Sequence, residues 1–410
     1  MPRFTLPPGR NVDDALAIAL IVAAAVVSQI VALRLRMPAI VPLLVSGVVL
    51  GPFVIDAFDP DKLFGDLVDP MVELAVGVIL FEGSLLLRRE ELEGGAGPVV
   101  VRLITVGFAI TWALSALGAV VLLDLDTRMA ILLGAVLSLS GPTVVLPLLD
   151  FIRPTERVGV VLKWEGILID PVGAIFAVLA FGAISTGASE FQPGEFLATV
   201  AVGVGVGVAA AALAVLALRT RLLPSLESSV LLALVLLAVA VASELKEDAG
   251  LVAAIAMGVT LAHRREDIEH QAHAFVTTLT SLLTGFLFVI LSARVDPDRV
   301  TDLGWEGLAF VAVLILLVRP VAALAGTLGT ALAPGERGLI AWMMPRGIVA
   351  ASTVSAFELA LVEQGVPGAH KLVPVTFLVV VVTVLVYGLT GRPVARALGV
   401  AEEEDQRSDV

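Results

Sequence analysis

Hydrophobic segments long enough to cross a bilayer follow one another along nearly the whole chain, and this feature constrains the fold most. A helix rises about 1.5 Å per residue, so about twenty apolar residues span the hydrocarbon core. With 58% hydrophobic residues and a mean hydropathy of +1.00, the chain is predicted to be an all-α polytopic membrane protein. We count thirteen segments, near 13–34, 38–56, 67–87, 98–123, 128–149, 158–183, 194–218, 227–244, 249–263, 273–294, 304–332, 337–361 and 372–396.

Charged residues between the segments predict the orientation of the chain. Arginines gather at alternate segment ends, as at Arg34, Arg153 and Arg264, and acidic residues gather at the opposite ends. Because basic residues stay on the cytoplasmic side, we expect the N-terminus outside and the C-terminus in the cytoplasm of a multi-pass plasma-membrane protein. Residues 1–400 are expected to form a single membrane domain, followed by an acidic, disordered cytoplasmic tail at 401–410.

The sixth segment carries an acid near the middle of the bilayer. Asp170 lies well inside the hydrophobic run 158–183, where a charged carboxylate costs about 2.5–3.5 kcal/mol on insertion scales. Such an acid usually marks a path for ions or protons, and the alternative is an acid paired with a base for structure alone. With no cysteine and four histidines that do not converge, no catalytic residue is predicted and an enzyme is disfavoured.

Proline and glycine interrupt two further segments at mid-membrane. The fifth contains Ser140-Gly141-Pro142, and the twelfth contains Pro345-Arg346-Gly347. Proline removes a backbone donor, and unwound backbone is tolerated in a membrane only where it is buried or lines a cavity. One such proline is most often a simple kink, but paired breaks near an intramembrane acid predict a transport site between two discontinuous helices.

A short pattern recurs in the second and ninth segments. The second reads LVSGVVL from Leu44, and the ninth reads IAMGVTL from Ile255, with the glycine and the last leucine in register. Segments seven apart run in opposite directions, so a duplication would be an inverted repeat in which segments one to six correspond to eight to thirteen. Chance similarity between Val/Ala/Gly-rich helices is the alternative.

Taken together, these features resemble the monovalent cation:proton antiporter family, close to the NhaP-like sodium/proton antiporters, over nearly the whole chain. The resemblance rests on Pro38 to Leu44 with Gly51-Pro52, Phe81-Glu82-Gly83, Ser140-Gly141-Pro142, Glu165 to Asp170, Arg319-Pro320 and Pro345-Arg346-Gly347. It implies thirteen spans, crossed discontinuous helices at spans five and twelve, and elevator-like alternating access. It also implies a core around spans three to six and ten to thirteen, and dimerisation helices that include spans one, two and seven to nine.

The resemblance also implies roles for single residues. Asp170 matches the acid that binds a cation or a proton in competition, and Glu82 matches an acid on the third span. Glu165 and Arg346 match a buried structural ion pair between the sixth and twelfth spans. Helix geometry favours separate roles for the two acids of the sixth span, because five residues at about 100° each turn Glu165 about 140° from Asp170.

The chain departs from the antiporter pattern at two positions that could bind a cation. The family usually has a Thr-Asp pair where this chain has Ser140 and Gly141, and an Asn where it has Ile169. We therefore expect a cation at Asp170 to take its other oxygens from a few groups only. The candidates are Ser140, Thr143, the backbone around Gly141, Glu82 and water.

The predicted function is exchange of Na⁺, and of Li⁺, for H⁺ by alternating access in the service of pH homeostasis. Burial favours the neutral carboxyl, so proton and cation compete for Asp170, and one such acid implies electroneutral 1:1 exchange. The alternatives are a K⁺/H⁺ antiporter and a cation-coupled solute symporter; a passive channel is disfavoured because no continuous polar lining is evident. The expected partners are membrane lipid, a second copy in a homodimer, and the transported ions, with no cofactor and no nucleic acid.

Overall fold

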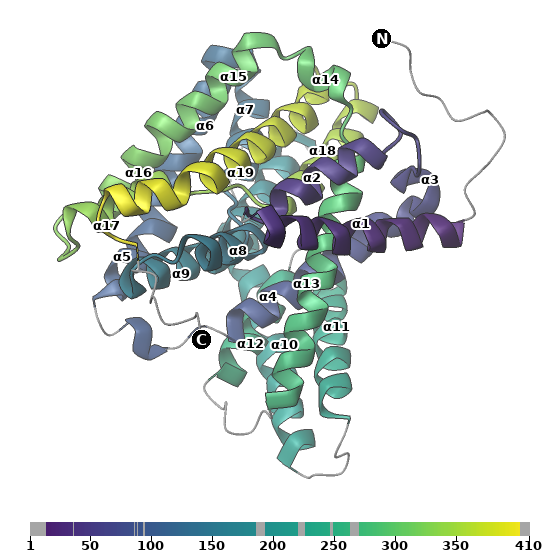
Figure 1. Cartoon of the computed structure of the whole chain (residues 1–410), viewed down its shortest axis with the longest axis vertical. Coiled ribbons are helices and arrows are strands. Elements are labelled where there is room, and N and C mark those ends of the chain that lie inside the picture. Colours follow the sequence, from purple (N-terminus) through teal and green to yellow (C-terminus); the bar gives the residue numbers. More distant parts are fainter. Residues whose placement is uncertain are drawn as a thin grey trace.

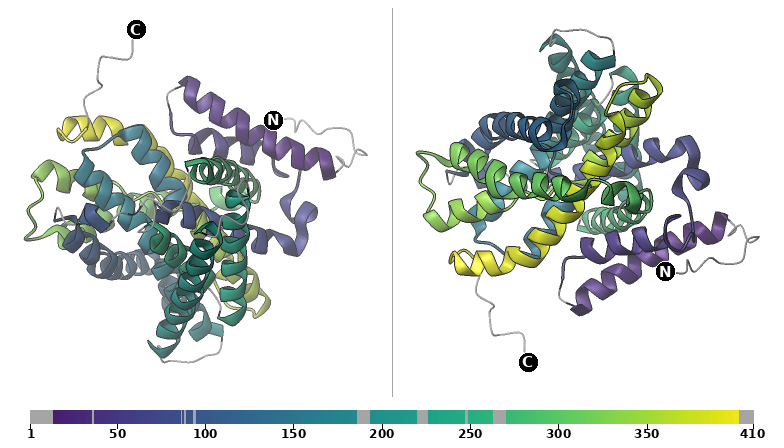
Figure 2. Two further views of the ribbon diagram at one scale, coloured as in Figure 1. Left: turned by 90° about the horizontal axis from the view of Figure 1, so that it is seen from below. Right: turned by 90° about the horizontal axis from the view of Figure 1, so that it is seen from above.

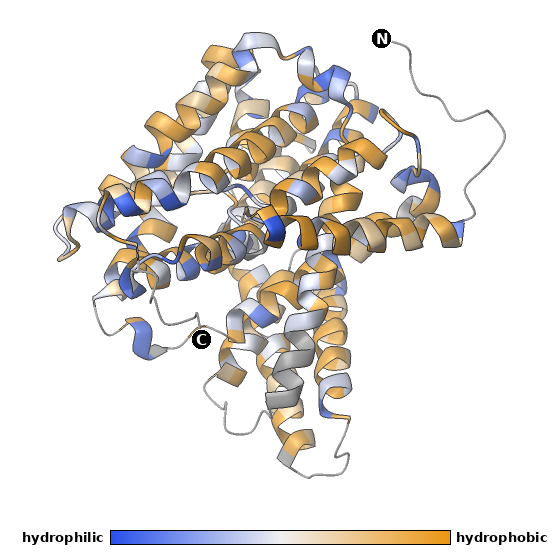
Figure 3. Ribbon diagram, viewed as in Figure 1, coloured by the Kyte–Doolittle hydropathy of each residue, from blue (hydrophilic) through white to orange (hydrophobic). Residues whose placement is uncertain are grey.

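The computed structural model describes residues 14–35, 37–85, 87, 89–92, 95–185, 193–219, 226–246, 249–262 and 270–401. These residues are mostly helical and contain no strand. Hydrophobic residues follow the helices over most of their length, and hydrophilic residues gather towards helix ends and connections (Figure 3). The acidic tail predicted from residue 401 lies outside the described residues except for Ala401.

Each predicted segment forms one helix or consecutive helical pieces. Seven helices are long and apolar enough to cross a membrane, and shorter apolar helices accompany them among the described residues. The all-α polytopic fold class is thereby confirmed. In the first half the helices are α1 (Asp14–Leu35), α2 (Ile40–Leu50), α3 (Pro60–Phe64), α4 (Val68–Leu85), α5 (Ala96–Arg102), α6 (Phe108–Leu123), α7 (Thr127–Val136), α8 (Pro142–Ile152) and α9 (Glu156–Ser185). The second half contains α10 (Pro193–Arg219), α11 (Glu227–Leu245), α12 (Ala249–Ala262), α13 (His270–Ala293), α14 (Pro297–Thr301), α15 (Gly304–Val313), α16 (Arg319–Thr327), α17 (Pro334–Trp342), α18 (Ile348–Glu363) and α19 (Leu372–Ala397).

The helices pack as two bundles (Figures 1 and 2). The first bundle comprises α1–α4 and α10–α13, in which α12 packs against α4, α10 and α11, and α13 packs against α1, α2 and α4. The second bundle comprises α5–α9 and α15–α19, in which α7 packs against α6 and α9, and α18 packs against α19. By these contacts α4 and α13 lie with the first bundle, whereas the family resemblance implied that spans three and ten belong to the core.

The recurring glycine pattern marks equivalent contacts in the two halves of the chain. Gly47 brings α2 close to α13, and Gly258 brings α12 close to α4. In each case a Cβ would collide with a backbone carbonyl and with the Cβ of a serine three residues further on. A Cβ on Gly47 would meet Val289 and Ser292 on α13, and a Cβ on Gly258 would meet Phe81 and Ser84 on α4. Small residues allow such close backbone approach between membrane helices, and the repeated geometry is that of an inverted repeat.

Two π-helical turns occupy corresponding spans of the repeat. In the fourth span η3 (Leu103–Gly107) joins α5 to α6, and in the eleventh span η5 (Leu314–Val318) joins α15 to α16. A π-helical turn inserts one extra residue per turn and therefore rotates the residues that follow it. Arg319 is the first residue after η5.

The two predicted discontinuous helices are present and cross at their breaks. The fifth span is unwound at 137–141 between α7 and α8, where Gly141 caps α8 and Pro142 is its first residue. The twelfth span is unwound at 343–347 between α17 and α18, so that Pro345 lies within the break and Gly347 caps α18. A Cβ on Gly347 would lie 2.7 Å from the backbone nitrogen of Gly141. The absence of a side chain on Gly347 thus allows the two breaks to touch.

The crossing yields a test of stability. We expect Gly347→Ala to lower the free energy of unfolding by about 1–3 kcal/mol, because the new methyl group meets backbone that cannot move aside. Thermal melting in detergent would measure the loss. Gly205→Ala on α10 is a matched control, since a Cβ there meets nothing within 4 Å. Equal melting temperatures for the two variants would contradict this account of the crossing.

Candidate ion-binding site

Asp170 lies on α9 in the middle of the second bundle and is fully buried, with 0% of its surface exposed. Neither of its carboxyl oxygens accepts a hydrogen bond of good geometry among the described residues, although the backbone amide of Ser140 lies near the carboxyl. Pro171 follows it inside the helix and lacks the N–H that would otherwise bond the Ile167 carbonyl. A buried carboxyl without partners is costly in its charged form unless a proton or a cation neutralises it.

The face of α9 that carries Asp170 lies against the broken fifth span. The backbone amide of Ser140 lies close enough to Asp170 to interact with it electrostatically. A Cβ on Gly173, nearly one turn after Asp170, would lie 2.8 Å from the Leu139 side chain. Asp170 therefore faces unwound backbone, whose amides and carbonyls are not all used within a helix.

The hydroxyl of Ser140 ties the two breaks together. Ser140 Oγ donates a hydrogen bond of 3.0 Å to the carbonyl oxygen of Pro345, and the serine is buried. The Gly141 carbonyl accepts from the amides of Val144 and Val145 at the start of α8. A role for Ser140 and Gly141 as cation ligands stays a prediction, and the side chain of Thr143 lies outside the described side chains.

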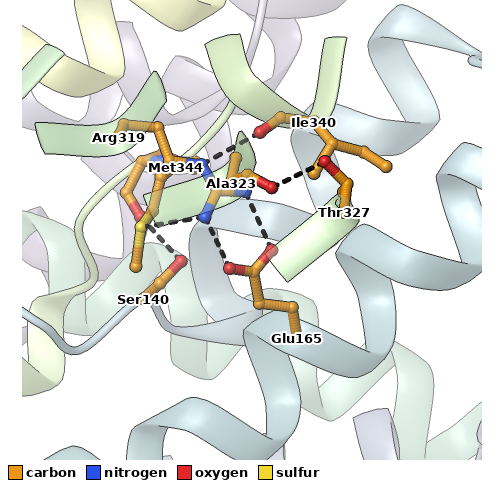
Figure 4. A network of polar contacts seen from close by, with 8 residues as sticks. Ser140, Glu165, Arg319, Ala323, Thr327, Ile340 and Met344 are labelled. Carbon is orange, nitrogen blue, oxygen red and sulfur yellow. Dashed lines mark hydrogen bonds and ion pairs between the residues drawn. The ribbon is translucent and has the colours of Figure 1, made fainter. Parts of the chain in front are cut away.

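Glu165 forms a buried ion pair with Arg319, contrary to the prediction that Arg346 would be its partner. Arg319 Nη1 and Nη2 donate to the two oxygens of Glu165 at 2.5 and 2.9 Å (Figure 4), and the two side chains are 2% and 5% exposed. Arg319 Nε also donates to the Ile340 carbonyl at 2.9 Å. Both charges are thus neutralised within the protein, as burial in a membrane requires.

The sequence contains a signal for this ion pair, but the periodicity of a helix does not identify which residues pair. Arg319 stands in the middle of the hydrophobic segment 304–332 and belongs to one of the matched motifs. An intramembrane arginine needs an acidic partner. The spacing of residues along α9 does not show whether Arg319 or Arg346 pairs with Glu165. The π-helical turn η5 directly before Arg319 changes the direction of this side chain relative to a regular helix, and the sequence pattern does not predict it.

Arg346 lies in the break of the twelfth span with its guanidinium buried. The residue is 2% exposed, and Nη1 has no hydrogen-bond partner among the described residues. Its backbone N–H donates to Thr383 Oγ1 on α19 at 3.3 Å. Its electrostatic neighbours include Tyr387, Arg319 and Glu165. Arg346 therefore adds positive charge near the ion pair without replacing Arg319 in it.

Glu82 lies on α4 in the first bundle, across from the helix that carries Asp170. It is 7% exposed, and its carboxylate accepts a hydrogen bond of 2.9 Å from the Thr277 hydroxyl on α13. Its predicted part in binding the cation stays a prediction.

A small cavity adjoins the crossing on the side of the ion pair. Ser140, Glu165, Gly166 and Pro345 contribute to its lining, together with apolar side chains of α8, α9 and the twelfth-span break. The cavity has room for roughly one water molecule. The cavity thus borders the ion pair and the contact between Ser140 and Pro345, and Asp170 is not among its lining residues.

Comparison with known proteins identifies the family of the chain. The chain matches the family described as sodium/hydrogen exchanger, transmembrane, over residues 17–397. It is 25% identical over 386 residues to the K⁺/H⁺ antiporter NhaP2 of Shewanella sp. strain MR-4, covering 92% of this chain and 66% of that protein. It is 25% identical over 347 residues to Na⁺/H⁺ antiporter 1 of Methanocaldococcus jannaschii, covering 82% of this chain and 80% of that protein. The chain thus spans just under two thirds of the length of NhaP2.

The fold agrees with a solved antiporter structure. The sodium proton antiporter MjNhaP1 from Methanocaldococcus jannaschii at pH 8 superimposes with a TM-score of 0.79 at 22% identity, covering 94% of this chain and 99% of that chain. At this identity the likeness shows the fold, and the family match over nearly the whole chain confirms the resemblance seen in the sequence. This multi-pass membrane chain belongs to the transmembrane sodium/hydrogen exchanger family, whose members are transporters and not enzymes.

Proposed function

We propose that this protein exchanges a monovalent cation, Na⁺ or Li⁺, for H⁺ by alternating access. The observation that carries the proposal is Asp170, which is fully buried without a hydrogen-bond partner and faces the unwound backbone of the fifth span. A carboxyl in this position can be neutralised by a proton or by a cation, but not by both at once. Each reorientation would thus carry one of them.

The ion pair supports a stoichiometry of one cation for one proton. Both oxygens of Glu165 accept from Arg319, so the charge of this acid is already neutralised within the protein. Asp170 is left as the single loading carboxylate of α9. Exchange of one cation for one proton moves no net charge across the membrane.

Potassium is the second candidate cargo. The related proteins from Shewanella are named K⁺/H⁺ antiporters. In addition, the site offers few side-chain oxygens to a cation. Ile169 lies in an apolar cluster with Phe108 and Met344 and is 0% exposed, so it supplies no ligand. A site with few protein ligands compensates poorly for the water that an ion loses on binding, and K⁺ loses its water at lower cost than Na⁺ or Li⁺, so such a site suits the larger cation.

The two bundles suggest which parts move. We place the moving body in the second bundle, because it contains the crossing, Asp170 and the ion pair, and the static body in the first bundle. Residues 1–400 would act as one membrane domain, with the N-terminus outside and the C-terminus in the cytoplasm. From the family resemblance we propose a homodimer in lipid, to be tested by the mass of the purified protein in detergent.

The role of Asp170 can be tested with one substitution. We expect Asp170→Asn to reduce exchange to the background of empty vesicles, because an amide cannot release a proton or pair with a cation. The measurement is fluorescence of a pH dye in inside-out vesicles after addition of Na⁺, Li⁺ or K⁺, which also identifies the cargo.

The control for this variant is Asp150→Asn, since Asp150 lies at the exposed end of α8 and should be dispensable. Both variants should elute and melt like the unmodified protein. Proton-coupled cation flux that persists in Asp170→Asn would place the site elsewhere.

The stoichiometry can be tested with the membrane potential. In proteoliposomes with fixed Na⁺ and H⁺ gradients, a potassium diffusion potential of either sign should leave the initial exchange rate unchanged if exchange is electroneutral. A rate that rises or falls with the sign of the potential would mean that more than one proton moves per cation.

The structural role of the ion pair can be tested by stability. We expect Arg319→Ala to destabilise the protein by about 3–5 kcal/mol, because it leaves the Glu165 charge buried and unpaired. Replacing both partners, Glu165→Leu with Arg319→Met, should recover most of the loss. Arg346→Ala is the comparison, and a larger loss of melting temperature for Arg346→Ala than for Arg319→Ala would show that the pairing is wrong.

A further inference from the structure

Two connections between the bundles lie at equivalent places in the inverted repeat. The first leads from α4 to α5 and contains the short helix η2 (Arg89–Leu92). The second leads from α13 to α15 and contains α14. They join spans three and four on the predicted cytoplasmic side, and spans ten and eleven on the predicted outer side. If one bundle moves against the other, these two connections must bend somewhere.

The inner connection is held to the second bundle by one carboxylate. Glu91 of η2 accepts a hydrogen bond of 2.7 Å from Lys163 Nζ and another of 3.1 Å from Trp164 Nε1. Both donors belong to α9, and the Lys163 and Glu91 side chains are 17% and 19% exposed. The two donors are the residues directly before Glu165 of the buried ion pair.

The outer connection is held to the second bundle by a carboxylate as well. Arg299 Nη2 of α14 donates to Glu358 Oε1 of α18 at 2.5 Å and to the His370 carbonyl at 2.7 Å. The second oxygen of Glu358 accepts from the Val373 amide at the start of α19 at 2.8 Å. Glu358 is 7% exposed, so α14, α18 and α19 meet at one buried acid.

Within a few residues the outer connection passes from contacts with the first bundle to contacts with the second bundle. Arg294 Nη2 lies 3.0 Å from Asp61 Oδ1 of α3, in the first bundle. The next residue, Val295, packs into an apolar cluster with Ala351 and Phe377 of the second bundle. The bundle boundary therefore falls at Arg294 and Val295, before α14 begins.

From these contacts we infer that Glu91 and Glu358 are latches that bind both connections permanently to the second bundle, so that η2 and α14 travel with it. The inference rests on the proposed motion of the second bundle during exchange. It distinguishes latches from gates: a gate opens in each cycle, whereas a latch stays closed throughout. A charge-assisted hydrogen bond to a largely buried carboxylate holds better than a fully exposed ion pair, and Glu358 is buried although the Arg299 side chain is 42% exposed. On the outer connection we assign the bending to Arg294 and Val295, next to the first bundle.

Cross-linking can separate a latch from a gate, because the chain contains no cysteine and any introduced pair of thiols is the only one present. Glu91→Cys with Lys163→Cys spans the inner latch, and Arg299→Cys with Glu358→Cys spans the outer one. The matched control is Val41→Cys with Gly388→Cys, which joins the two bundles, since a Cβ at Gly388 lies 3.7 Å from Val41 Cγ2. Each pair would be linked by a bis-methanethiosulfonate reagent in vesicles and released again with a reductant.

We expect linking either latch to change the exchange rate less than about twofold relative to the same variant before linking. Linking the control pair should reduce exchange to background, with recovery on reduction. Arrest at either latch would overturn the inference and show a gate. If exchange continued undiminished with the control pair linked, both the inference and the proposed motion would be wrong. If the unmodified protein and all unlinked variants showed no exchange, the proposed function itself would be rejected.

A second measurement leaves the latch residues in place. Nitroxide labels on Glu90→Cys with Glu156→Cys, and on Asp302→Cys with Glu363→Cys, report the distance from each connection to the second bundle at exposed positions. These distances should stay the same when Na⁺ at high pH is replaced by H⁺ at low pH. The distance from Glu90→Cys to Ala262→Cys, at the end of α12, should change, and a change within either latch pair instead would contradict the inference.

Discussion

A bilayer supplies no water to a buried charge, so an acid inside a membrane helix must be neutralised by a base, a cation or a proton. The helix α9 carries two such acids, and the structure treats them differently. Glu165 accepts two hydrogen bonds from Arg319, whereas Asp170 has no hydrogen-bond partner among the described residues. The ion pair makes one acid part of the scaffold, and in the proposed mechanism the other acid takes up ions that come and go.

The scaffold around these acids depends on close contact between two broken helices. Ser140 hydrogen-bonds across the crossing to Pro345, and Gly347 approaches the backbone of Gly141 without a side chain between them. Unwound backbone can exist at this depth because protein surrounds it on all sides. The same crossing brings α9, the breaks and the eleventh span together, so Asp170, the ion pair and the small cavity lie around it.

Much of this arrangement could be predicted from the sequence. The thirteen segments, the breaks at Gly141-Pro142 and Pro345-Gly347, and the inverted repeat all follow from hydrophobicity, proline and glycine, which act through local backbone chemistry. The helical turn places Glu165 and Asp170 on different faces of the sixth span, and the family resemblance implied different roles for them. The partner of Glu165 could not be predicted, because Arg319 and Arg346 are both intramembrane arginines, and periodicity within one helix does not reveal which other helix it meets.

The sequence by itself therefore determined what must lie in the membrane, where the helices break and which acid is left in the middle of the sixth span. Those features depend on how each residue interacts with lipid and with its own backbone. The tertiary structure decided that Arg319 neutralises Glu165, that Glu82 bonds to Thr277, and that α4 and α13 pack with the first bundle. These are contacts between residues far apart in the chain, and they depend on how the helices pack against one another, which no local pattern encodes.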